Sequence, residues 1–236
     1  MFCCSRTLPL ICVGGLLAAL LASAAAPVTP PAPAAPAAQD AKAPKDAKDA
    51  KDAKDSKDPK AAKAAPGAGA TDFQVDPVHS SVVFRIQHMG VSFFHGRFNS
   101  ISGHVNLDAE TPANSAVEIT IDSASIDTNN AKRDDDCRGP DLLNASEFPQ
   151  ISFKSDSVKA LGKDRYEVAG QLTFHGETKP LTVQVDQTGL GKGRGGQMAG
   201  FETTFTIKRS DFGMDAMQGA LGDEVRLTLG IEAHAK

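Results

Sequence analysis

The stretch SVVFRIQH, residues 81–88, alternates apolar and polar side chains, so that Val82, Phe84, Ile86 and His88 share one face. Successive side chains of a β-strand point to opposite sides of the sheet, and this two-residue period therefore predicts a strand with one buried face. The period recurs about eight times up to residue 231, and turn residues such as His175-Gly176 separate the runs. Short alternating strands at this spacing indicate an antiparallel sandwich or a closed barrel.

The alternation is interrupted at two places within residues 71–236. The phase changes between Phe98 and Ile101, which predicts a bulge or bend near Asn99 and Ser100. Residues 132–145 show no alternation, and we expect a short helix or an ordered loop there. The segment contains no repeat, and its length is that of one domain with a substantial core.

Residues 1–25 have the layout of a secretory signal peptide. Arg6 precedes an apolar stretch from Leu8 to Leu21, and a run of small residues follows. The stretch is shorter than the roughly 20 residues that a membrane-spanning helix needs, so we expect cleavage near Ala25 and export. Cleavage would leave Cys137 as the remaining cysteine, without an internal disulfide partner. Cys137 is then either a redox or intermolecular handle or, since no partner is visible, an incidental small side chain.

Residues 26–70 are rich in Ala, Pro, Lys and Asp, with Lys-Asp-Ala repeated between Lys45 and Asp58. Such a segment has too little apolar bulk to form a core, and it predicts a disordered or partly helical linker. The linker is either a spacer or a solvated tail without a partner.

Charge and motif spacing exclude several function classes. Residues 71–236 carry 16 Lys and Arg against 23 Asp and Glu, which disfavours nucleic acid as a partner. The histidines at 79, 88, 95 and 104 match none of the compact zinc spacings, so we expect no metal site. The sequence has no nucleophile elbow and no Gly-rich phosphate loop, and we expect no enzyme and no catalytic residues.

A series of short motifs carries a family resemblance. They are DPVHS (76–80), FRIQHMG (84–90), GRF (96–98), SIDT (125–128), RD (133–134), EFPQISF (147–153), GQLTFHGETKP (170–180), RSDFG (209–213) and DEV (223–225). In this order they resemble the YceI-like family over essentially all of residues 71–236. The resemblance implies an all-β, eight-stranded antiparallel, lipocalin-like barrel in the periplasm. It also implies that the barrel holds a long polyisoprenoid lipid or isoprenoid quinone as its ligand.

The sequence departs from the family pattern at one loop. After Arg133-Asp134 the family usually has a His-Leu pair, where this chain has Asp136-Cys137. Head-group recognition at that loop therefore does not carry over by resemblance.

The interior of an eight-stranded barrel is either filled by side chains or just wide enough for one small ligand. The absence of Trp, with Gly103 and Gly170 at inward positions, favours room for a slender chain. The positions on the inward-facing side of the two-residue alternation (the strand parity), together with the resemblance, predict the lipid-binding lining. It consists of Phe84, Ile86, Val105, Val117, Ile119, Phe153, Leu172, Phe174, Phe205 and Leu227. Hydrogen bonds at a polar mouth are predicted for His79, His88, Arg133 and Asp134.

The entrance is expected near residues 89–95, where Phe93 and Phe94 either gate the mouth and touch a bilayer or simply cover one end of the barrel. The expected function is binding with transport or sequestration of a long-chain isoprenoid, by a monomer or homodimer. The alternative is a periplasmic stress or scaffold module with a filled barrel and a protein partner.

Overall fold

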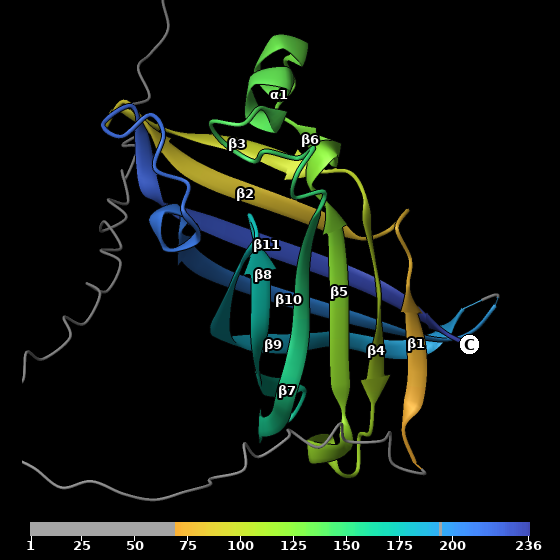
Figure 1. Ribbon diagram of the computed structural model, residues 1–236. Helices are drawn as coiled ribbons and strands as arrows, with labels where there is room; N and C mark the ends of the chain where they lie inside the picture. The colour runs from red at the N-terminus through yellow and green to blue at the C-terminus, as the bar shows by residue number, and fades with distance from the viewer. Residues whose placement is uncertain (1–68, 194) are drawn as a thin grey trace, which may run out of the picture. The chain divides into compact units, whose positions relative to one another are not determined.

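The structure, a computed structural model, describes residues 69–193 and 195–236. The predicted signal peptide at 1–25 lies outside the described residues, as does the predicted linker apart from its last two positions. The described strands are β1 (Thr71–Val75), β2 (Ser81–His88), β3 (Ser92–Phe98), β4 (Ile101–Leu107), β5 (Ala116–Asp122), β6 (Ile126–Asp127), β7 (Gln150–Gly162), β8 (Arg165–Phe174), β9 (Glu177–Gly193), β10 (Gly196–Lys208) and β11 (Leu221–Ala235). The helix α1 spans Ala131–Arg138, and single 3-10 turns lie at Pro112–Asn114, Ser123–Ser125 and Arg209–Phe212 (Figure 1).

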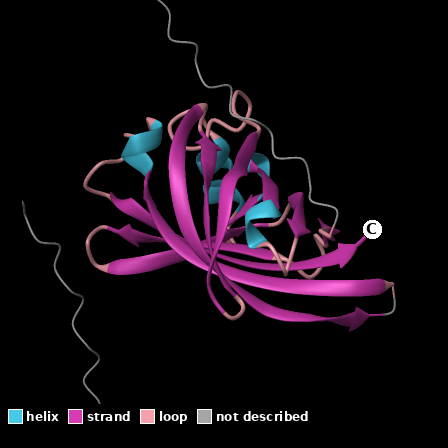
Figure 2. Cartoon of the chain, turned by 90° about the horizontal axis from the view of Figure 1, so that it is seen from below, coloured by secondary structure: helices cyan, strands magenta, loops and turns pink. Residues whose placement is uncertain are grey.

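These strand segments occupy eight positions around a closed antiparallel ring. β1 and β2 lie end to end and both pair with β11. At the next position, β4 pairs with β1 and β3 pairs with β2. At the position after that, β5 pairs with β4 and β6 pairs with β3. β7, β8, β9 and β10 follow in chain order, and β10 pairs with β11 to complete the ring. This confirms the predicted all-β, eight-stranded antiparallel barrel. Figure 2 shows the strands curving around a common interior.

Three of the eight positions are interrupted strands, which is why the ring contains more segments than positions. The predicted bend at Asn99 and Ser100 is the break between β3 and β4. Residues 76–80 separate β1 from β2, and the 3-10 turn at Ser123–Ser125 separates β5 from β6. The predicted hairpin turn at His175-Gly176 joins β8 to β9, with both residues at positive φ.

The most densely packed part of the interior lies where β1 closes on β11. Phe73, Val82 and Ala233 are at most 1% exposed, and Val75 and Ala199 lie beside them in the ladder. Ala233 lies opposite Val75 on β1 and opposite Ala199 on β10, and these small side chains allow the strands to pack closely around the larger ones. Full burial of a side chain such as Phe73 contributes about 1.5–3 kcal/mol to stability.

Two glycines serve a purpose other than the predicted one. A Cβ atom at Gly170 would collide with the Lys154 carbonyl and the Phe153 ring, and one at Gly103 would collide with the Glu118 carbonyl. Neither glycine lines the barrel cavity, and Gly103 also has a φ of 140°. The expectation that they leave room for a ligand is therefore wrong: they allow neighbouring strands and one aromatic ring to approach closely.

Polar contacts hold α1 on the barrel. The Asn130 side chain caps the helix by accepting a hydrogen bond from the Arg133 N–H (3.0 Å). The buried Asp134 carboxylate accepts hydrogen bonds from the N–H of Thr128 (2.7 Å) and from its hydroxyl, and Arg138 donates to the carbonyls of Ala124 and Ile126. The helix covers the first half of the segment predicted as helix or loop, and turns complete it. None of the helices in the described part of the chain has the length and apolarity needed to cross a bilayer.

Arg209 organises the connection between β10 and β11. Arg209 is 5% exposed, and its guanidinium donates to the carbonyls of Met214, Ala216 and Gly222 at 2.5, 2.6 and 3.0 Å. Ser210 donates to the Asp223 carboxylate through both its N–H and its hydroxyl. One buried cation thus supplies charged hydrogen bonds to several backbone carbonyls of the connection and of the start of β11.

Replacing Arg209 with Met keeps the apolar stem and removes these donors. We expect the free energy of unfolding to fall by about 3 kcal/mol, because buried carbonyls lose charged hydrogen-bond donors. Urea denaturation measures the change, with Lys208→Met on the exposed neighbouring residue as the control, expected within about 0.5 kcal/mol of the parent protein. Equal stability of the two variants would contradict the assigned role.

Candidate binding cavity

An apolar cavity of about 600 Å³ occupies the barrel interior. Inward-facing side chains of β2, β4, β5 and β7 to β11 form its wall. All ten positions predicted as the lining border this cavity, namely Phe84, Ile86, Val105, Val117, Ile119, Phe153, Leu172, Phe174, Phe205 and Leu227. Their role in binding a ligand stays a prediction.

The burial of the inward side chains shows that the interior is hollow. Phe84, Phe153, Phe205 and Leu227 face inward and pack on the core, yet each is only partly buried. An inward side chain keeps accessible surface only when it borders empty space, because a close-packed interior leaves few voids larger than a water molecule. The barrel therefore differs from the alternative of a filled interior.

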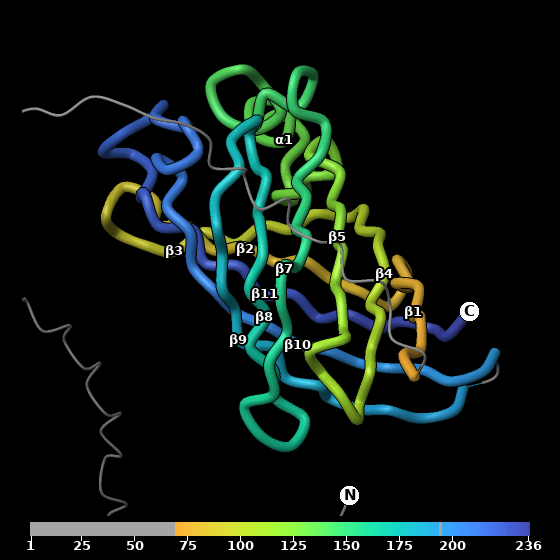
Figure 3. Tube along the Cα trace, turned by 60° about the horizontal axis from the view of Figure 1, so that its bottom comes forward, coloured from red at the N-terminus to blue at the C-terminus, as the bar shows by residue number. Residues whose placement is uncertain are grey.

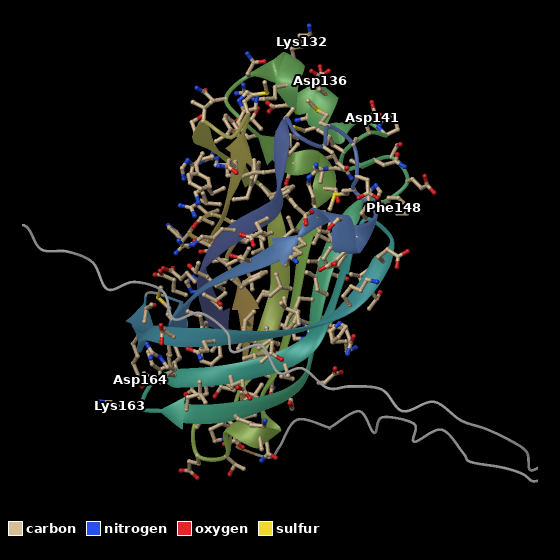
Figure 4. The ribbon with its side chains drawn as sticks, turned by 90° about the vertical axis from the view of Figure 1, so that its left-hand side faces the viewer. Lys132, Asp136, Asp141, Phe148, Lys163 and Asp164 are labelled. Carbon is tan, nitrogen blue, oxygen red and sulfur yellow. The ribbon has the colours of Figure 1, made fainter. Side chains whose placement is uncertain are left out.

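The cavity opens at the end of the barrel that carries α1. Three segments meet there: the β2–β3 hairpin, the α1 region and the β10–β11 connection. The lining residues in these segments that are exposed to solvent are His88, Ser92, Phe93, Arg133, Asp136 and Met217. The Met89 N–H donates to the Ala220 carbonyl (2.7 Å), so the hairpin and the connection lie side by side, as Figure 3 also shows. Figure 4 places Lys132 and Asp136 at this end and Lys163 and Asp164 at the opposite end.

Two arginines hold the aromatic side chains of the hairpin. The Arg133 guanidinium lies 4.4 Å from the centroid of the Phe94 ring, and that of Arg85 lies 4.0 Å from the centroid of the Phe93 ring. Such cation–π pairs contribute about 0.5–1 kcal/mol at exposed sites. Arg133 also donates to the Thr128 hydroxyl (2.9 Å) and carbonyl (2.6 Å), which fixes the guanidinium between the helix and the hairpin. The segment predicted as the entrance thus borders the cavity with both rings.

The four predicted polar residues separate into two pairs. His88 and Arg133 line the cavity at its mouth. His79 does not line it, since its imidazole is at 2.8 Å from the Asp76 carboxylate in the break between β1 and β2. Asp134 does not line it either, because its carboxylate is used beneath α1 to bind Thr128.

Several lining residues outside the strands carry no signal in the strand pattern of the sequence. Asp136, Cys137, Leu142 and Leu143 come from the α1 region, and Met214 and Met217 from the β10–β11 connection. Helices and turns lack the two-residue period, so parity gave no signal for them. The Asp136-Cys137 pair, at the expected departure from the family pattern, is the sequence feature that pointed to this loop.

Cys137 is the one free cysteine of the described residues, and it borders the cavity. Removal from water raises the pKa of its thiol, and the negative charges of Asp134 and Asp136 raise it further. A higher pKa leaves less thiolate at neutral pH, so this thiol is a weak nucleophile.

The ring of eight antiparallel strand positions and its apolar interior, open at one end, define a lipocalin-like barrel. The chain belongs to the YceI-like family, whose domain matches residues 73–233. It is 40% identical to a UPF0312 protein of Pseudomonas aeruginosa (strain LESB58) and 41% identical to one of Yersinia pestis (strain Pestoides F). Each match extends over 168 residues, covering 70% of this chain and 87% of the relative.

Solved structures show the same fold. BcnA of Burkholderia cenocepacia is 27% identical with a TM-score of 0.63, and the match covers 68% of this chain and 99% of that one. A structure from Saccharophagus degradans, described as a polyisoprenoid binding domain implicated in plant cell wall breakdown, is 16% identical with a TM-score of 0.56. That match covers 70% of this chain and 98% of the other, and at this identity it shows a likeness of fold alone.

Cys137 provides a chemical probe of the cavity. We expect alkylation by N-ethylmaleimide to be slower in the folded protein than in urea and to keep accelerating at pH values where the unfolded thiol is already ionised, because the raised pKa delays thiolate formation. An added C20 prenyl alcohol is expected to slow the reaction further by occupying the cavity. Time-resolved mass spectrometry of the folded protein measures the rate.

The matched control combines Cys137→Ser with Ser146→Cys, which places the thiol on an exposed residue outside the lining. Its alkylation rate is expected to be unaffected by the alcohol. Equal protection of both thiols would show that the effect does not come from the cavity.

Proposed function

We propose that the protein binds a long-chain isoprenoid lipid, such as a polyprenyl chain or an isoprenoid quinone, in the barrel cavity and carries or sequesters it in the periplasm. The hollow apolar interior is the observation that carries this proposal. At about 30 Å³ for each carbon-sized group, 600 Å³ leaves space for at least about 20 carbon atoms. The lining is predominantly apolar, which favours binding over catalysis.

The energetics favour exchange at a membrane. Transfer of about 20 carbon atoms from water gains about 16 kcal/mol at 0.8 kcal/mol per CH₂, which exceeds most estimates of the association cost, about 4–15 kcal/mol. In a bilayer the same chain is already in an apolar solvent, so the net free energy of transfer into the barrel is small. A protein with this balance retains its lipid in water and releases it at a membrane.

The polar residues at the mouth suggest the orientation of the ligand. His88, Arg133 and Asp136 lie at the open end, whereas the deeper lining is predominantly apolar. The chain of the lipid is therefore expected inside and its polar end at the mouth. The Saccharophagus structure, described as a polyisoprenoid binding domain, shows that this fold is associated with such a ligand elsewhere. The signal-like residues 1–25 support delivery to the periplasm.

Filling the cavity tests the proposal. Val117→Trp adds a large ring at a half-buried lining position, and we expect lipid occupancy to fall at least about tenfold while the barrel stays folded, since the site has empty space to receive the ring. Native mass spectrometry of the exported protein purified without detergent, followed by organic extraction, measures occupancy and identifies the lipid.

Val83→Trp is the matched control, because Val83 lies on the outer face of β2 and is 37% exposed. It is expected to retain its lipid. Full occupancy in Val117→Trp, or an empty parent protein that also refuses an added polyprenol, would reject the cavity as the binding site.

We also propose a transient contact between the mouth and a membrane. Met89, Val91, Phe93 and Met217 are 59%, 87%, 53% and 53% exposed. They belong to the hairpin and the connection that border the open end, so an apolar rim surrounds the path of the ligand. Insertion of this rim into a bilayer would join the cavity to the apolar phase that holds the lipid.

Val91→Asp places a charge on the rim without altering the lining. We expect transfer of a fluorescent prenyl lipid between vesicles to slow about tenfold, because the charge opposes insertion into the bilayer. Leu161→Asp is the control, since Leu161 is 47% exposed beside the β7–β8 turn at the opposite end (Figure 4). Equal transfer rates with unchanged occupancy would exclude the rim from exchange.

A further inference from the structure

A cluster of metal-ligating side chains lies outside the cavity, where the break between β1 and β2 crosses the end of β11. Asp76 and His79 come from the break, and Glu232 and His234 from β11. One donor atom from each of Asp76, Glu232 and His234 lies within 4.8 Å of the other two. None of the four residues lines the cavity.

The distances between donor atoms suit one cation. The Asp76 Oδ2 atom is 2.8 Å from His79 Nδ1 and 3.2 Å from His234 Nε2. The Glu232 Oε1 atom is 3.7 Å and 3.4 Å from the same two nitrogens. Tetrahedral zinc, with bonds of about 2.0–2.2 Å to nitrogen and oxygen, places its ligand atoms about 3.3–3.6 Å apart. Small side-chain adjustments would let Asp76, Glu232 and His234 surround a cation, and His79, which lies outside this group of mutually close donors, would complete a fourth position by turning its imidazole toward the ion.

The backbone fixes these residues before any cation arrives. The Asp76 N–H donates to the Glu232 carbonyl (2.8 Å), and the Ser80 hydroxyl bonds both the N–H and the carbonyl of Glu232 (3.1 and 3.2 Å). The second oxygen of Asp76 accepts from the Val78 N–H (2.7 Å), which orients the carboxylate. Such outer contacts position the ligands of metal sites and strengthen binding.

We propose that Asp76, His79, Glu232 and His234 bind a divalent cation of the zinc class on the outside of the barrel. Two carboxylates and two neutral imidazoles supply two negative charges for a doubly charged ion. Imidazole ligands favour zinc, copper or nickel over magnesium and calcium, which prefer sites built from oxygen alone. Within the described residues, both carboxylates form ion pairs with imidazoles. When a metal binds, an imidazole loses its proton more easily than Lys or Arg does.

The site would clamp the closure of the barrel. Its ligands come from opposite ends of the domain sequence, so a bound cation ties the β1–β2 break to β11. A ligand that binds the folded chain alone stabilises it by mass action, and zinc is expected to raise the melting temperature. The sequence spacing of the histidines did not indicate this site, because half of the ligands are carboxylates and the two pairs are far apart in the chain.

The test is calorimetric titration of the exported protein, prepared without a histidine tag and treated with a chelator, with Zn²⁺. We expect one cation per chain, a rise in melting temperature that EDTA reverses, and no comparable response to Mg²⁺. His234→Gln and Glu232→Gln are each expected to weaken binding at least about tenfold, as loss of a metal-binding group does. His95→Gln, on an exposed histidine of β3 outside the cluster, is the matched control and is expected to bind as the parent does.

Substitution with Co²⁺ adds a readout of geometry, since tetrahedral cobalt gives intense visible absorption that His79→Gln is expected to diminish. Far-UV circular dichroism tests whether each variant is folded. If His234→Gln does not fold, Glu232→Gln provides the test of the site. Absence of stoichiometric binding would overturn the proposal. Equal zinc affinity in His234→Gln, Glu232→Gln and His95→Gln would also overturn it. The zinc would then be bound adventitiously by surface side chains. An unchanged cobalt spectrum in His79→Gln would overturn the four-ligand assignment.

Discussion

Closure of the sheet on itself is the constraint on which the rest of the structure depends. β11 pairs with β10 on one side and with β1 and β2 on the other, so every interior strand face points at the same enclosed volume. Closure also removes the open edges through which an antiparallel sheet would otherwise pair with another chain. With eight positions the interior is close to the limit at which side chains fill it. Whether it stays hollow then depends on the size of a few inward residues, and here Phe73, Val75 and Val82 fill the part near β1 while the remainder stays open.

The three interrupted strand positions give the barrel chemically distinct regions. The break at 76–80 moves polar side chains off the sheet and gathers them over β11, away from the lipid-sized cavity. The turn at Ser123–Ser125 leads into β6 and then α1, which borders the mouth with Arg133 and Asp136. An uninterrupted ladder would offer only alternating inward and outward faces. The breaks allow acidic and basic groups to gather at the ends while the wall stays apolar.

The sequence predicted the wall of the barrel well and its ends poorly. Strand parity is a local property, so eight strand positions and ten residues that border the cavity follow from a two-residue period together with the family resemblance. Parity says nothing about how strands approach each other, which is why Gly103 and Gly170 were misinterpreted as space for a ligand. It also fails for turns and helices. Asp134 was predicted at the mouth but is used to bind Thr128, whereas Asp136, two residues later, borders the cavity.

Many residues that carry the family resemblance hold the ends of the barrel together. His175 lies against the Phe148 ring and hydrogen-bonds the Phe212 carbonyl (3.0 Å), so three of the motifs meet at one corner. Arg209 and Asp134 likewise bind backbone groups of neighbouring turns. The motifs therefore specify a closed barrel with an ordered mouth, and they carry little information about a ligand. Under the proposed function, ligand selectivity would depend on the width of the apolar lining and on the few polar mouth residues, including Asp136. The residues that define the family are thus different from those that would select a ligand. The family follows from motifs in the sequence, whereas the ligand depends on the dimensions of the cavity.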